Sequence, residues 1–315
     1  MKLKGIWGLF TEAIKSWSAD YAPSMGAALS YYTLFSIAPL LIIVIAVAGF
    51  FFGADEVRGT LFAQLSGLMG DSGAKAIQDM LQAANRPKQG LVGTVSGIAL
   101  LLVAATTVFA ELQNSLDRIW RAPARDESSG LASLIRARLL SFGMILAIAF
   151  LLIVSLVVSA ALSALGKWWD PWFHGWEALA HVLNFAVSFG LVTVLFALIY
   201  KIIPRVEVAW HDVWVGAAVT SLLFTIGKFL ISLYLGKSDV GSSFGAAGSL
   251  VIVMVWVYYS SQIFLVGAEF TWVYAHELGS RRGVQRPGAL AKAEESRPEE
   301  PPVPGHEGRR AQQPA

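Results

Sequence analysis

The sequence predicts an all-α integral membrane protein built around a bundle of six transmembrane helices. Of its 315 residues, 55% are hydrophobic and only 15% are charged, whereas soluble domains carry about 25% charged residues. The hydrophobic residues form continuous blocks of roughly 20 residues, the length with which a helix crosses a bilayer. These blocks lack the alternation of a membrane β-strand. The six predicted spans are residues 31–52, 91–110, 139–165, 182–203, 213–235 and 249–274.

The two ends of the chain flank one membrane domain, residues 21–279. Residues 1–20 predict an amphipathic helix that lies on the membrane surface, because large apolar side chains recur there at helical spacing. Residues 280–315 hold half of the twelve prolines, mixed with charged and polar residues, and predict a disordered tail. The apolar residues of the surface helix are Trp7, Phe10, Ile14 and Trp17.

The segment between the first two spans predicts two short amphipathic helices outside the membrane. Apolar residues recur at helical spacing over 57–68 and again over 77–84. Between them, Gly70-Asp71-Ser72-Gly73 is typical of a break. The two helices would either cap the bundle or form a lid over a cavity.

The distribution of basic residues predicts the orientation. Seventeen of the 24 lysines and arginines fall at the end of the predicted bundle that carries both termini and the loops after the second and fourth spans. Basic residues concentrate on the cytoplasmic side of membrane proteins. We therefore expect both termini in the cytoplasm and a location in the inner (plasma) membrane of a bacterial-type cell.

Two ionisable residues inside predicted spans indicate possible functional positions, because such groups are costly at membrane depth. Lys228 lies roughly 22 Å from the cytoplasmic start of its span and Glu269 roughly 8 Å from the cytoplasmic end of the sixth, at 1.5 Å per helical residue. They are thus too far apart for a salt bridge, and Lys228 should lie level with Ser260 and Gln262. The expected partner of Glu269 is an arginine: Arg118, Arg136 or Arg138.

A polar face follows the second span. Glu111, Asn114 and Arg118 succeed one another at steps of three and four residues, which places them on one side of a continuing helix. Together with Glu269 they predict a polar pocket open toward the cytoplasm. This pocket would be either an ion-pair network that fixes the order of the helices or a site for a substrate or lipid headgroup.

Proline and glycine indicate local irregularities. Pro39 lies inside the first span and removes one backbone hydrogen bond, so a kink is expected there. Gly245 and Gly248 precede the sixth span and would permit close helix contact or a non-helical turn.

The residues that enzymes use are not arranged in any recognisable motif. There is no cysteine, and the five histidines are scattered without a metal-ligand spacing. Phosphate-binding and serine-nucleophile motifs are also absent. We therefore expect no catalysis, no metal and no cofactor. A net charge of +2 without a basic, aromatic-rich surface gives no support for nucleic-acid binding.

Three segments, with the spacing between them, resemble the YihY/BrkB family of multi-pass inner-membrane proteins, once labelled ribonuclease BN. The resemblance covers about residues 5–279, and its most specific part includes Gly245 through Gly248 and the sequence Gly267-Ala268-Glu269. Phe244 departs from the pattern, where tyrosine is expected, so a hydroxyl role there is not implied. The segments are GAALSYYTLFSIAPLLI (26–42), ELQNSLDRIWRAP (111–123) and SSFGAAGSLVIVMVWVYYSSQIFLVGAEF (242–270).

The resemblance implies six helices and an inner-membrane location, with a role in envelope maintenance, lipid handling or solute transport. Together with the polar positions it favours a protein that moves or binds a lipid or amphiphilic solute, with membrane lipids as partners. A scaffold that recruits envelope proteins and transports nothing is the alternative. A membrane ribonuclease is disfavoured, because the residues offer neither a metal cluster nor an RNA surface.

Overall fold

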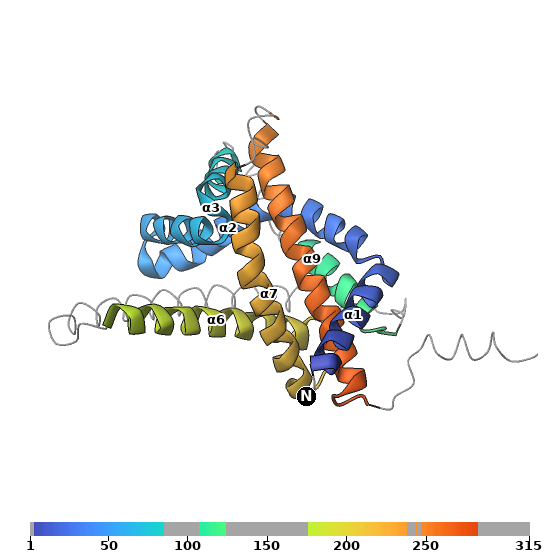
Figure 1. Cartoon of the computed structure of the whole chain (residues 1–315). Coiled ribbons are helices and arrows are strands. Elements are labelled where there is room, and N and C mark those ends of the chain that lie inside the picture. Colours follow the sequence, from blue (N-terminus) through green and yellow to red (C-terminus); the bar gives the residue numbers. More distant parts are fainter. Residues whose placement is uncertain (1–2, 85–106, 124–175, 238–243, 245–246, 283–315) are drawn as a thin grey trace, which may run out of the picture.

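The computed structural model describes residues 3–84, 107–123, 176–237, 244 and 247–282, and within them the fold is entirely helical (Figure 1). The predicted spans 139–165 and most of 91–110 lie outside these residues, as does the predicted tail beyond residue 282. An unlabelled helix covers residues 107–119. The labelled helices are α1 (Leu3–Ala19), α2 (Ala22–Phe52), α3 (Ala54–Ala84), α6 (Trp176–Ile202), α7 (Trp210–Lys237) and α9 (Gly248–Glu277).

Four described helices are long and apolar enough to cross a membrane, which agrees with the predicted membrane fold. These stretches coincide with the predicted spans 31–52, 182–203, 213–235 and 249–274, although the first begins nine residues earlier than predicted. The stretches are Ala22–Phe50, Phe185–Ile202, Trp210–Leu235 and Leu250–Glu277. Helix α2 continues through Pro39 without ending there.

Helix α1 packs against the C-terminal part of α9 (Figure 1). Phe10 contacts Phe270 with the ring centroids 4.9 Å apart, and Leu9 and Ala13 are buried in the core. Trp7 remains 77% exposed. The apolar residues of α1 therefore serve two surfaces: some pack on the bundle, while Trp7 remains accessible to a membrane interface.

Helix α3 consists of two helical segments separated at Gly70, as the glycine-rich break predicts. Gly70 has φ 77° and ψ 169°, and Gly53, just before α3, has φ 88°. Both values lie in the region that side chains other than glycine avoid. The second segment buries Ile77 beside Leu41 of α2 and Val253 of α9, so this half of α3 packs against both helices.

Helices α7 and α9 run antiparallel and side by side (Figure 1). They meet through a reciprocal glycine–threonine contact. A Cβ at Gly216 of α7 would overlap Thr271 of α9, and a Cβ at Gly267 of α9 would overlap Thr220 of α7. The hydroxyls of Thr220 and Thr271 each donate to the carbonyl four residues earlier, at 2.7 Å. Each threonine thus fills the space left by a glycine while its hydroxyl is satisfied within its own helix.

Two further close approaches extend this packing. About two helical turns beyond Thr220, Gly227 packs against Ile263 and Tyr259 of α9. On α6, the Tyr200 hydroxyl donates to the Phe264 carbonyl at 2.8 Å and lies 3.0 Å from the Thr220 hydroxyl. The same small-residue surface therefore holds three helices together.

Replacement of Gly70 by alanine should destabilise the protein by about 1–2 kcal/mol, because its left-handed backbone is costly for any residue with a Cβ. No atom lies within 4 Å of the added methyl group, so the cost would come from the backbone alone. Gly59→Ala, at a helical and open position in α3, should instead be neutral or stabilising by up to about 1 kcal/mol. Thermal unfolding in detergent measures both; equal effects would contradict the assigned break.

The substitution Gly216→Ala should destabilise the protein by about 1–3 kcal/mol, because the new methyl group overlaps Thr271. Thr271→Gly in the same chain should recover much of that loss by removing the overlapping atoms. Gly190→Ala in α6, which meets nothing within 4 Å, is the matched control. A double variant no more stable than Gly216→Ala would show that the two residues do not face each other.

Candidate functional site

A cavity of about 540 Å³ lies among α2, α3, α6, α7, α9 and the helix over 107–119. Most of its lining is leucine, valine and phenylalanine. Six polar residues interrupt this apolar wall: Thr33, Gln64, Ser188, Lys228, Ser260 and Ser261. A cavity of this composition suits a ligand with both an apolar and a polar part.

Lys228 is the cationic residue of this lining. Its position follows from the packing of its neighbour Gly227 against Tyr259 and Ile263, which fixes α7 closely on α9. Ser260 lines the same cavity, as the helix register leads one to expect. Among the described residues, no carboxylate pairs with Lys228 and no acceptor bonds its ammonium group.

Gln262 and Gly267 take part in helix packing in the described part of the chain. A Cβ at Gly26 of α2 would overlap the Gln262 amide, so this glutamine occupies the α2–α9 contact and does not line the cavity with Lys228. Gly267 admits Thr220 and Tyr200, and Gly248 begins α9. Gly245 lies outside the described residues.

A second group of polar residues lies at the end of the bundle where α1, the turn after residue 119 and the C-terminal part of α9 meet. Arg121 donates to both carboxylate oxygens of Asp20 at 2.6 Å. Glu269, with 0% exposure, interacts electrostatically with both of these residues. The Arg121 guanidinium also lies 5.5 Å from the ring centroid of Trp272.

The arginine beside Glu269 in the described structure therefore differs from the predicted ones. Arg118 lies over the ring of Tyr21, 5.6 Å from its centroid, while Arg136 and Arg138 lie outside the described residues. The difference arises because Arg121 leaves the helix in a left-handed conformation, with φ 53°. Helical spacing alone could not place it.

The polar face after the second span divides between two surroundings. Asn114 is exposed and Glu111 half-buried. The contacts to the α6–α7 loop come from other residues of this helix: Gln113 donates to the Ile203 carbonyl at 3.0 Å, and Asp117 pairs with Arg205 at 2.8 Å. These contacts attach the helix over 107–119 to the α6–α7 loop.

Sequence reasoning missed four charged residues of this end: Asp20, Asp117, Arg121 and Arg205. The sequence contains features that could have drawn attention to three of them. Asp20 is the last charged residue before the first long apolar stretch, and both Asp117 and Arg121 lie in the segment 111–123. Their partners are distant in sequence, so no spacing rule could pair them.

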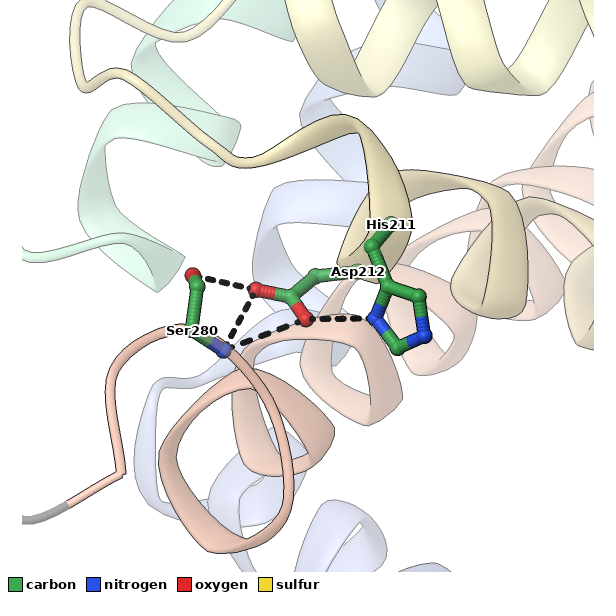
Figure 2. A network of polar contacts seen from close by, with 3 residues as sticks. All are labelled: His211, Asp212 and Ser280. Carbon is green, nitrogen blue, oxygen red and sulfur yellow. Dashed lines mark hydrogen bonds and ion pairs between the residues drawn. The ribbon is translucent and has the colours of Figure 1, made fainter.

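Asp212 forms a third polar group, with His211 and Ser280 (Figure 2). It accepts a hydrogen bond from the Ser280 hydroxyl at 2.5 Å and lies 3.5 Å from Nδ1 of His211. The aspartate lies between the other two, whereas a serine nucleophile needs the histidine in that place. Asp212, fully buried, thus fastens the chain after α9 to the start of α7. No group of three potential metal ligands occurs among the described residues.

Comparison with known proteins supports the membrane assignment. A "UPF0761 membrane protein" of Verminephrobacter eiseniae is 29% identical over 278 residues, 87% of this chain and 63% of the relative's length. Another from Psychromonas ingrahamii is 27% identical over 77% of this chain and 79% of its own. One from Alteromonas mediterranea is 26% identical over 92% and 95%.

No solved structure matches the chain. The chain spans less than two thirds of the Verminephrobacter relative, so the activity of that whole protein is not carried over. The family model described as virulence factor BrkB matches residues 13–290, which agrees with the resemblance carried by the three sequence segments. The chain belongs to the virulence factor BrkB family.

Proposed function

We propose that this protein binds an anionic lipid or other amphiphilic anion in the cavity beside Lys228 and moves it across or within the inner membrane. The observation that carries the proposal is a lysine inside an apolar span that lines a cavity and has no anionic partner among the described residues. The polar pocket predicted around Glu111, Asn114, Arg118 and Glu269 is not needed for it.

The energetic argument starts from the position of Lys228. It lies seven residues before the end of the apolar stretch Trp210–Leu235, which is about 10 Å along the helix. A charged side chain at such a depth is expensive unless it pairs with an anion or reaches water. A bound anion would pair with the Lys228 ammonium group and offset the cost of its charge. This offset would favour binding of the anion.

The remaining lining determines the class of ligand. The hydroxyls of Ser188, Ser260 and Ser261 can donate to the oxygens of an anionic group. The leucine, valine and phenylalanine side chains suit an acyl chain or another apolar body. At about 540 Å³, the cavity lies within the range of roughly 300–1,000 Å³ that is usual for small-molecule sites.

The end of the bundle with Asp20, Arg121 and Glu269 is proposed to face the cytoplasm. The N-terminal helix, the turn after residue 119, the α6–α7 loop and the chain after α9 all meet there: Arg205 pairs with Asp117, and Arg281 donates to the Glu207 carbonyl at 2.9 Å. Four segments predicted to share one side of the membrane are therefore in contact. This supports a common side for both termini, and the excess of basic residues at that end supports the cytoplasmic side.

The variant Lys228→Leu should lose at least about 10-fold in affinity for a fluorescent fatty-acid anion, since one charge-assisted contact in an apolar site accounts for about 1.5–3 kcal/mol. Binding is measured with purified protein in nanodiscs, and lipid scrambling and uptake in liposomes. Lys228→Arg should retain most of the affinity, and Lys75→Gln, an exposed lysine of α3, should change nothing. Full binding and transport by Lys228→Leu would refute this site, whereas absence of any transport by the unaltered protein would favour the scaffold.

Tags placed at the two chain ends should both be protected in intact cells and both become accessible after the inner membrane is opened. A tag inserted next to Asp71 in α3 should instead be accessible from outside. The physical reason is the excess of basic residues at the end that carries both termini. Termini on opposite sides would contradict the proposed topology.

A further inference from the structure

Asp20, Arg121 and Glu269 form a group of two buried acids and one partly exposed base. Glu269 has no exposed surface, and the Asp20 side chain is 9% exposed. The described charged groups that act on Glu269 are these two neighbours, from the α1–α2 junction and the turn after residue 119. From α6 and α7, the groups packed nearest along α9 are uncharged: the hydroxyls of Tyr200 and Thr220 beside Gly267.

The hydrogen bonds of this group are incomplete. Arg121 is directed at Asp20, with both oxygens at 2.6 Å. The same guanidinium lies 5.5 Å from the ring centroid of Trp272, about one helical turn after Glu269, which places the Asp20–Arg121 pair beside Glu269. No N–H or O–H donor of the described residues bonds either Glu269 oxygen. Two carboxylates can only accept, so a hydrogen bond between them requires one proton.

The charge count leads to the same requirement. With both acids ionised, the group would carry one uncompensated negative charge in a buried position, which is far more costly than a neutral group. One proton makes the group neutral and supplies the missing donor. Two carboxylates that share a site repel each other, and in other proteins such a pair holds one proton between them.

The backbone around this group is also unusual. Tyr21, the residue after Asp20, has φ 57°, and Arg121 has φ 53°; within the described residues these are the positive values outside glycine. Such conformations cost roughly 1–3 kcal/mol and cluster where a structure serves a function. Here they bring a carboxylate and a guanidinium from different segments against α9.

We propose that Asp20 and Glu269 form a proton-binding site, with Arg121 as the neighbouring counter-charge, and that loss or gain of this proton is coupled to substrate movement. The coupling rests on the proposed function. Its physical route is short: α2 continues from the Asp20 junction to Leu29 and Thr33 in the cavity wall, and α9 carries both Glu269 and the cavity residue Phe264. A change in charge between these helices therefore acts on the two elements that shape the cavity.

Infrared spectroscopy of the protein in nanodiscs tests the site without any substrate. At neutral pH the spectrum should contain one protonated-carboxyl C=O band that disappears in Glu269→Gln. It should disappear also in Asp20→Asn, because one acid beside one arginine remains ionised. Arg121→Gln should strengthen the band, since two acids without a base favour a second proton. A purely structural ion-pair network predicts no such opposite changes.

Glu111→Gln, a half-buried acid outside this group, is the control and should retain the band. The proposal would be overturned if the infrared spectra of the unaltered protein and Glu269→Gln differed only in the bands of ionised carboxylates. So would a band that sodium removes in the unaltered protein, because that result assigns the site to a metal cation. If Glu269→Gln does not fold, the changes of the band in Asp20→Asn and Arg121→Gln still test the proposal.

Liposomes with a pH gradient test the coupling separately. The gradient should stimulate uptake of the fatty-acid anion several-fold above protein-free liposomes with the unaltered protein, and not with Glu269→Gln. Gradient-stimulated uptake by Glu269→Gln would overturn the coupling. Absence of uptake by the unaltered protein would refute the proposed function while leaving the infrared result to decide the proton site.

Discussion

The close antiparallel contact between α7 and α9 is the constraint on which the rest of the described structure depends. Because lipid provides little hydrophobic drive for helices to associate, they must pack through small residues and local hydrogen bonds. The reciprocal pairs Gly216–Thr271 and Thr220–Gly267 meet this need and set the register of the two helices. That register leaves Lys228 at the level of Ser260, where both line the cavity.

The same contact explains why the chain ends converge. Once α7 and α9 are in register, the start of α7 lies beside the end of α9, and Asp212 can accept hydrogen bonds from Ser280. Helix α1 then packs on the last turns of α9 through Phe10 and Phe270. Four segments far apart in sequence thereby form one polar end, at which Glu269 is enclosed.

Several features were predictable from the sequence because they depend on local chemistry. Contacts between distant segments were not predictable in this way. The spans around Lys228 and Glu269 follow from the length of their apolar stretches, and the break at Gly70 from its glycine-rich surroundings. The pairing of Asp20 with Arg121 depends instead on a left-handed turn at a residue that is not glycine. No period of 3.6 residues contains that information, so the predicted partners of Glu269 were Arg118, Arg136 or Arg138. The register set by the glycine–threonine pairs was also not predictable, because it depends on how two helices distant in sequence pack together.

The two polar positions of the bundle pose opposite electrostatic problems. At Lys228 a positive charge lines an apolar cavity, and at Glu269 a second acid exceeds the single arginine beside it. An anion would neutralise the first position and a proton the second, so under the two proposals these two positions are both neutral only when both ligands are bound. Uncompensated charge is costly in a bilayer, and therefore the state with both ligands would rearrange most easily. Such a preference is what couples the movement of an anionic amphiphile to that of a proton.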